Sequence, residues 1–192
     1  MVTGRNGSGK STLLRVLATA IRADLGTARV LGFDCRRQKD EVRRQVALLS
    51  HQSHLYEALT PLENLAITAR FMDAKPAAGR IEALLADVGL ADRARDPVAT
   101  FSAGMRKRLS LARVLLQDAP VLLLDEPHGQ LDPPGFRMVD ELVGRLRAAG
   151  RTVLMATHLL ERGAAVCDQA IVLEQGRLTW TGPAAAIPQG AA

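Results

Sequence analysis

The chain has 192 residues, 47% of them apolar, which is enough to build the core of one domain and excludes an intrinsically disordered protein. Aromatic residues make up only 3%, too few for a platform that stacks the bases of single-stranded nucleic acid. The net charge of +5 suits either an arginine-rich surface or a polyanion partner, because the basic residues are scattered and form no long tract. No apolar run approaches the ~20 residues that cross a bilayer, and the first residues do not predict secretion.

The first fifty residues predict a loop, a helix and two strands. Residues 4–9 are too rich in glycine for regular structure, and residues 11–22 carry leucines at helical spacing. Short strands are expected at residues 28–31 and 46–50, with a helix over residues 38–44 between them.

The middle of the chain, from about residue 55 to residue 116, is expected to be mostly helical. The segment Thr60-Pro61-Leu62-Glu63 has the spacing of a capping box with proline at the first helical position. A helix should therefore run from there to about residue 72. Two further helices are expected, over residues 80–88 and from Ser102 onward.

The last third of the chain predicts strands that alternate with helices. The expected strands are residues 121–124 and 152–157 and a hairpin of 170–173 with 178–180; the expected helices are residues 139–150 and 159–166. This alternation indicates an α/β fold with a largely parallel sheet covered on both faces. Such sheets bind ligands at the carboxyl ends of their strands.

The segment Gly4-Arg5-Asn6-Gly7-Ser8-Gly9-Lys10-Ser11 matches the phosphate-loop pattern G-x-x-x-x-G-K-[ST]. Its glycines allow positive φ angles and let backbone N–H groups point at a phosphate, and the helix that follows adds its positive N-terminal end. Lys10 is expected to reach the β- and γ-phosphates, and the Ser11 hydroxyl to ligate Mg²⁺. The loop therefore predicts binding of a nucleoside triphosphate with Mg²⁺.

Two carboxylates, Asp125 and Glu126, directly follow the strand at residues 121–124. Asp125 is expected to reach Mg²⁺ beside the phosphate loop, and Glu126 to polarise an attacking water. Acids are common at strand ends, but together with the phosphate loop this pair predicts nucleotide hydrolysis.

With these two motifs the chain resembles the ATPase subunit of an ATP-binding cassette (ABC) transporter over nearly its whole length. Further elements resemble the family's motifs in the right order: Gln52 the Q-loop glutamine, Phe101-Ser102-Ala103-Gly104-Met105 the signature L-S-G-G-Q, Leu131-Asp132 the D-loop, and His158 the switch histidine. The resemblance implies an α/β P-loop NTPase fold of the ABC ATPase type. Residues 1–54 and 117–192 would form the P-loop core, and residues 55–116 an inserted helical subdomain that carries the signature.

The resemblance also implies a role for each site residue. Glu126 would be the base for water, His158 would stabilise the γ-phosphate, and Gln52 would help Ser11 and Asp125 to position Mg²⁺. Ser102 and Gly104 would face the γ-phosphate held by a second copy, so that two ATP molecules are sandwiched in a head-to-tail dimer. The remaining ATP contacts would come from Gly4, Asn6, Gly7, Ser8, Gly9, Lys10, Ser11, Thr12 and Asp132.

Transmembrane permease subunits are the implied partners, without direct contact to nucleic acid, and the ATPase would lie in the cytoplasm against the membrane. The permease contact is expected near residues 52–65. The strings Ser50-His51-Gln52 and Thr157-His158-Leu159-Leu160-Glu161-Arg162-Gly163 are similar to those of haem-exporter ATPases of cytochrome c maturation, although exporters of drugs and polysaccharides carry related strings.

The family normally places roughly thirty residues before the phosphate loop, about the size of a small antiparallel subdomain, with an aromatic residue that stacks on adenine. Only three residues precede Gly4 here, so residues 1–192 are expected to be an N-terminally truncated ABC ATPase domain. Two alternatives stay open: a soluble DNA-associated ATPase of the same architecture, and a remnant defective in nucleotide binding. The compact insertion and the lack of paired cysteines count against the first.

Several other polar residues are expected to be structural. The histidines His51, His54 and His128 are interpreted as surface or local hydrogen-bonding residues, and Arg106-Lys107-Arg108 as a solvated helix face. Cys35 and Cys167 are isolated and fit no metal or redox spacing, which suits a reducing cytosol.

Overall fold

The computed structural model describes residues 1–72 and 76–188. These residues form two compact units. The first comprises Met1–Ser50, Ala119–Pro127 and Asp140–Ala192, and the second comprises His51–Asp118 and His128–Val139.

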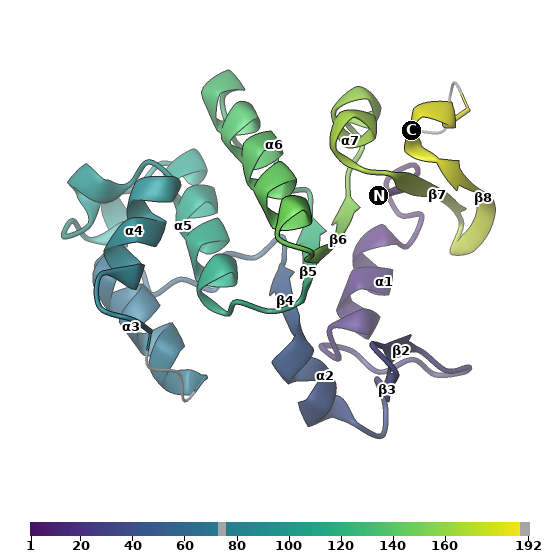
Figure 1. Cartoon of the computed structure of the whole chain (residues 1–192), viewed down its shortest axis with the longest axis horizontal. Helices are drawn as coiled ribbons and strands as arrows, with labels where there is room; N and C mark the ends of the chain where they lie inside the picture. Colours follow the sequence, from purple (N-terminus) through teal and green to yellow (C-terminus); the bar gives the residue numbers. More distant parts are fainter. Residues whose placement is uncertain (73–75, 189–192) are drawn as a thin grey trace. The chain divides into compact units, whose positions relative to one another are not determined.

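A six-stranded sheet forms the centre of the first unit (Figure 1). Its strands lie in the order β4 (Val46–Leu49), β5 (Val121–Asp125), β6 (Thr152–Ala156), β1 (Val2–Thr3), β7 (Gln169–Glu174) and β8 (Arg177–Pro183). Every neighbouring pair is parallel except the β7–β8 hairpin. The carboxyl ends of β1 and β5 consequently lie at the same edge of the sheet. The phosphate loop follows β1, and the acid pair lies at the end of β5.

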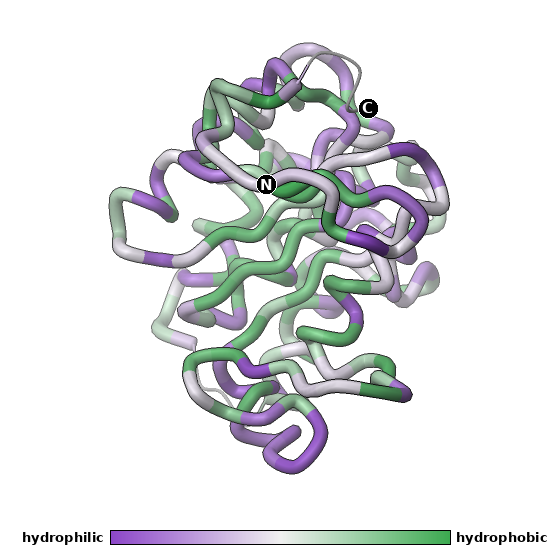
Figure 2. Tube along the Cα trace, turned by 90° about the vertical axis from the view of Figure 1, so that its right-hand side faces the viewer, coloured by the Kyte–Doolittle hydropathy of each residue, from purple (hydrophilic) through white to green (hydrophobic). Residues whose placement is uncertain are grey.

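Helices cover both faces of this sheet. Val2 and Leu14 belong to one buried cluster, on the face of α1 (Lys10–Leu17) and α2 (Lys39–Gln45). Met1 belongs to another cluster, on the face of α7 (Leu160–Val166). This alternation follows from the pleat, which directs successive side chains to opposite faces. Figure 2 shows the hydrophobic colouring running along the strands, as expected for a sheet buried on both sides.

A small hairpin, β2 (Arg29–Val30) with β3 (Phe33–Asp34), stands apart from the main sheet. Leu31 and Gly32 turn it with φ angles of 48° and 88°, the left-handed pair that a two-residue hairpin loop requires. The first strand was expected at residues 28–31, whereas the second was not. A strand of two residues is too short to show a period in its hydropathy.

The second unit is helical, with α3 (Pro61–Phe71), α4 (Arg80–Asp87), α5 (Ala103–Leu116) and the start of α6 (Pro133–Ala148), together with short 3₁₀ turns at Ala91–Arg93 and Val98–Thr100. A third 3₁₀ turn, Ala184–Ala186, belongs to the first unit. The predicted capping box of α3 is present: the Thr60 hydroxyl accepts from the Glu63 N–H, and the Glu63 carboxylate accepts from the Thr60 N–H. The expected helices over this region are therefore confirmed.

One expectation about polar residues was wrong, and another is narrowed. Lys107 is buried, with 8% of its surface exposed, so it is not part of a solvated face. His128 is also buried, with 1% exposed, which leaves only the second of its two predicted roles, a local hydrogen-bonding residue. On either side of Lys107, Arg106 reaches Glu57 and Arg108 pairs with Asp132. Helix α5 packs against both α3 and α4, which leaves little of its circumference for solvent.

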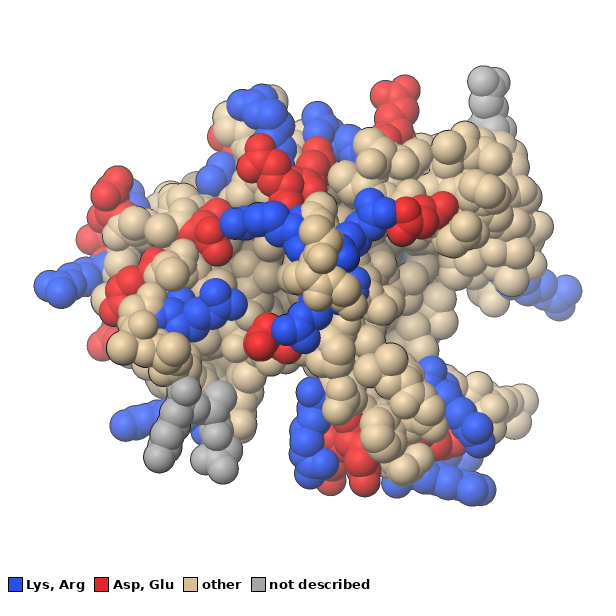
Figure 3. All heavy atoms as spheres, in the orientation of Figure 1, with Lys and Arg blue, Asp and Glu red and all other residues tan. Residues whose placement is uncertain are grey.

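The surface charges are mixed. Figure 3 shows Lys and Arg interspersed with Asp and Glu on the face it presents, with no continuous basic stripe. Over the described residues, no helix combines the length and the apolar character needed to span a bilayer.

Candidate nucleotide site

The phosphate loop joins the short strand β1 to α1. Gly9 caps α1 with a φ of 102° and offers no side-chain acceptor to the first turn. The backbone N–H groups at this helix end are therefore available to an anion. Asn6 and Gly7 are exposed at the loop tip, whereas Ser8 is buried, and its Oγ has no hydrogen-bond partner within the described residues.

The buried Lys10 side chain folds back across the loop. Its Nζ donates to the carbonyl oxygen of Gly4 at 2.6 Å and to that of Arg5 at 3.1 Å. These bonds hold a positive charge inside the ring of the loop, where phosphate oxygens are the expected counter-charge.

Gly4 is required for a reason that the sequence does not reveal. Its φ is 138°, and a Cβ at this position would lie 2.1 Å from the carbonyl oxygen of Leu173 in β7 and 2.9 Å from Ser8 Oγ. The glycine thus lets the start of the loop pack directly against β7.

The structure brings Ser11 and Asp125 together. The Ser11 hydroxyl donates to Asp125 Oδ1 at 3.0 Å, from the first turn of α1 to the end of β5. Thr12, the next residue of α1, is exposed. One hydroxyl and one carboxylate oxygen side by side are the protein ligands that Mg²⁺ takes when phosphates supply others.

Glu126 and His158 form a second pair at the same edge of the sheet. The His158 Nδ1 and Glu126 Oε2 atoms lie 2.9 Å apart. Glu126 has a φ of 45°, and its N–H donates to the Ala156 carbonyl, so the turn after β5 is anchored to β6 while the carboxylate stays partly accessible. Strain of this kind at a carboxylate is common at functional sites.

The remaining predicted site residues, Gln52, Ser102, Gly104 and Asp132, belong to the second unit. The Ser102 Oγ accepts from the Met105 N–H at 3.2 Å, which makes it the N-cap of α5, as expected. Ser102 and Ala103 are exposed, so the first turn of this helix is open to solvent.

Gln52 is exposed in the loop after β4, and the segment behind it is fixed within the second unit. The carbonyl of His54 accepts from Arg113 of α5 at 3.0 Å, and the buried amide of Asn64 in α3 accepts from the Tyr56 N–H at 2.8 Å. The loop that carries Gln52 is thus tied to the same helix that carries the signature.

Asp132 lies just before α6 and bonds to groups of its own chain. Its Oδ1 accepts from Arg108 Nη2 at 3.0 Å and from the Gly135 N–H at 2.9 Å. The Gly135 N–H bond, followed by the contact with Arg108, lowers the pKa of this carboxyl below its ordinary value. Sequence reasoning missed Arg108 and Gly135, although a glycine inside a helical pattern was a usable signal.

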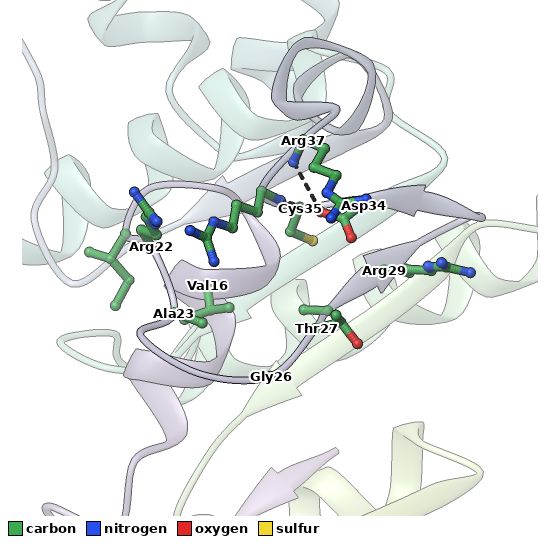
Figure 4. A pocket seen from close by; sticks show the side chains of 12 residues that line it. Val16, Arg22, Ala23, Gly26, Thr27, Arg29, Asp34, Cys35 and Arg37 are labelled. Atoms are coloured by element: carbon green, nitrogen blue, oxygen red, sulfur yellow. Dashed lines mark hydrogen bonds between the residues drawn. The ribbon is translucent and has the colours of Figure 1, made fainter.

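A separate basic pocket of about 350 Å³ lies in the first unit, between the end of α1 and the β2–β3 hairpin (Figure 4). Arg22, Arg29 and Arg37 project around it, with Cys35 and Asp34 between them. It contains none of the predicted nucleotide-binding residues. Burial, with the nearby Asp34 charge, raises the pKa of the Cys35 thiol.

Comparison with known proteins identifies the family. The family model described as "ABC transporter" matches residues 1–129. The chain belongs to the ABC transporter family.

Curated relatives of this ABC protein include ATP-binding proteins named for drug resistance and for export. The chain is 40% identical to the daunorubicin resistance ATP-binding protein DrrA3 of Streptomyces coeruleorubidus, over 95% of this chain and 58% of that protein. It is 32% identical to the ABC transporter ATP-binding protein NatA of Bacillus subtilis (strain 168), over 94% and 75% of the two chains. It is 35% identical to the Nod factor export ATP-binding protein I of Burkholderia orbicola (strain AU 1054), over 91% and 58%. The chain thus spans a little over half the length of the first and third of these relatives.

Solved structures show the same ABC ATPase fold. An ATP-binding subunit of an ABC transporter superposes with a TM-score of 0.85 at 28% identity, over 95% of this chain and 77% of that one. A dimeric ATP-binding cassette bound to ADP and Pi superposes with a TM-score of 0.86 at 24% identity, over 95% and 84%. The predicted fold class, an α/β P-loop NTPase of the ABC type with a largely parallel sheet, is confirmed.

Proposed function

We propose that this protein binds and hydrolyses ATP as the motor subunit of a membrane exporter. The observation that carries the proposal is the juxtaposition of two pairs at one edge of the sheet, Ser11 with Asp125 and Glu126 with His158. The first pair has the chemistry of a magnesium site, and the second that of a base for water with a partner that orients it.

The residues present fit Mg²⁺ and ATP. Ser11 and Asp125 would hold the metal together with phosphate oxygens and water, a set that Mg²⁺ prefers to an all-protein cage. In the described part of the chain there is no cluster of three His, Cys, Asp or Glu residues that would suit such a cage. When bound, the metal neutralises charge on the β- and γ-phosphates. Lys10 and the loop N–H groups would hold the phosphates, and the buried Ser8 hydroxyl, whose Oγ has no hydrogen-bond partner within the described residues, would donate to them.

Hydrolysis in this proposal is mostly positioning and electrostatics. Glu126 would accept the proton of the attacking water, and His158 would orient Glu126 and stabilise the γ-phosphate as it transfers. Gln52 would add a contact to the metal and its water. No covalent intermediate with the protein is needed.

A second copy would complete the site. Ser102 and Gly104, at the open first turn of α5, would approach the γ-phosphate held by the other copy. Ala103 stands where the signature has glycine, and it is exposed. Its methyl group would change the contact with the γ-phosphate of the other copy only slightly. Closure and reopening of this dimer would be transmitted to permease subunits through residues 52–65. The same permease subunits would hold the ATPase at the cytoplasmic face of the membrane.

Among possible cargoes, a drug-like molecule is better supported than haem. The relatives described above are named for daunorubicin resistance and Nod factor export, and they do not support the haem-exporter resemblance. They also favour an exporter over a DNA-associated ATPase.

Replacing Glu126 by Gln tests the proposal. We expect phosphate release by the purified protein to fall by about 10²-fold or more, since a general base contributes that much. Binding of Mg-ATP, measured by calorimetry, should persist. Glu161→Gln, on an exposed acid of α7, is the matched control and should hydrolyse normally. Unchanged hydrolysis in Glu126→Gln would remove Glu126 as the base, and absence of ATP binding by the unaltered protein would remove the function.

A further inference from the structure

The carboxylate of Asp132 joins two elements of the second unit. It accepts from Arg108 Nη2, in the second turn of α5, and from the N–H of Gly135, in the first turn of α6. It is therefore an N-terminal cap for one helix and an ion-pair partner of the other.

Gly135 leaves the space that this ion pair occupies. A Cβ on Gly135 would lie 2.8 Å from Asp132 Oδ1, 2.9 Å from Leu131 Cβ and 3.2 Å from Arg108 Nη2. Its φ is not in the left-handed region, so backbone conformation does not explain a glycine there. Glycine is an unfavourable residue inside a helix, and room for the Arg108–Asp132 pair is the steric reason for it.

A second contact joins the same two segments. A Cβ on Gly104, in the first turn of α5, would lie 3.0 Å from the carbonyl oxygen of Gln130. Gln130 has a φ of 67°, a left-handed conformation that is strained for a residue with a side chain. The backbone of Gln130 is therefore held in an unfavourable conformation against the signature turn.

We infer that Arg108, Asp132 and Gly135 are positioning residues, which lock residues 130–132 onto the signature end of α5. This inference rests on the proposed function: the lock presents the Ser102–Gly104 turn and residues 130–132 to the ATP of a second copy as one rigid surface. Asp132 then acts through its own chain and is not a ligand of the nucleotide.

Three variants of the protein separate the parts of the lock. Asp132→Asn keeps an oxygen acceptor for the Gly135 N–H and removes the charge. Arg108→Met removes the other partner, and Gly135→Ala keeps both charges but fills their space. We expect kcat for ATP hydrolysis to fall about 10-fold in each, corresponding to a loss of a charge-assisted contact, while the Kd for Mg-ATP of the monomer stays within about 2-fold.

The double variant Arg108→Met with Asp132→Asn decides between a lock and independent effects. Residues that act as one unit are non-additive, so its kcat should be no lower than that of the worse single variant. ATP-driven dimerisation, followed by light scattering in the Glu126→Gln background, should weaken in parallel with kcat in the three single variants. Arg106→Met, on the same helix but facing Glu57, is the matched control and should leave both measurements unchanged.

Other outcomes overturn the inference. A weaker Kd for Mg-ATP in Asp132→Asn would make Asp132 a nucleotide contact, and additive losses of kcat would show that the two residues act separately. Coupling between Arg108 and Asp132 in thermal unfolding without coupling in kcat would reduce the pair to a stabilising contact. Failure of the proposed function itself would appear differently, as no effect of Glu126→Gln on hydrolysis.

Discussion

The Ser11 hydroxyl hydrogen-bonds to Asp125 at 3.0 Å, joining two residues that lie 114 positions apart in the sequence. One comes from the phosphate loop and the other from the acid pair, so the two motifs form one site. The parallel pairing of β5 with β6, and of β6 with β1, places their carboxyl ends together. The contact is therefore a consequence of the sheet order.

This pair makes the dependence on Mg²⁺ testable. Asp125→Asn keeps the shape of the side chain but removes its charge, so we expect the Mg²⁺ concentration for half-maximal ATP hydrolysis to rise at least about 10-fold. Ser11→Ala should shift it in the same direction. The measurement is phosphate release during a Mg²⁺ titration at fixed ATP. Asp24→Asn, in an exposed loop, is the control. An unchanged Mg²⁺ requirement in Asp125→Asn would place the metal elsewhere.

Gly4 should be intolerant of any side chain. Gly4→Ala combines an unfavourable φ of 138° with a Cβ 2.1 Å from the Leu173 carbonyl, and we expect it to lower the free energy of unfolding by about 2–4 kcal/mol. Gly26→Ala, at a φ of 79° with no atom within 4 Å, isolates the backbone cost and should lose only about 1 kcal/mol. Urea unfolding measures both. Equal losses would show that packing on β7 is not what Gly4 provides.

The elements that were predicted correctly are those with a local signal. The capping box at Thr60 and Glu63 needs only a spacing of three residues, and the order of strands and helices follows from hydropathy. The phosphate-loop pattern and the acid pair likewise indicated Ser11, Asp125 and Glu126, and the resemblance to the family indicated His158. The fold assembles these residues at one edge of the sheet.

The features that were missed depend on contacts between distant segments. The pairing of Arg108 with Asp132 spans 24 residues, and nothing near either residue indicates it. The burial of Lys107 follows from packing on α3 and α4, which a single helix cannot reveal. The need for Gly4 arises from Leu173 in another strand, so the loop pattern alone suggested a different reason.

The capping box of α3 should make the stability of the folded protein depend on pH below neutrality. The N–H of Thr60, followed by its hydroxyl, lowers the pKa of the Glu63 carboxyl below its ordinary value. A carboxyl whose pKa is lower in the folded state contributes stability that is fully present above its unfolded pKa. That contribution is lost as the pH falls through the lower, folded pKa.

We therefore expect Glu63→Gln to have a lower Tm than the unaltered protein at about pH 7. This difference in Tm should shrink as the pH falls from about 5 to about 3. Below both pKa values the protonated Glu63 and the glutamine are equivalent caps, since neither carries charge. Differential scanning fluorimetry across this range measures the effect. Glu141→Gln is the matched control, since Glu141 is exposed on α6 and lies away from its first turn. The difference in Tm between this variant and the unaltered protein should not shrink as the pH falls. A Glu63→Gln difference that stays constant with pH would show that the cap acts through hydrogen bonding alone and not through the charge of Glu63.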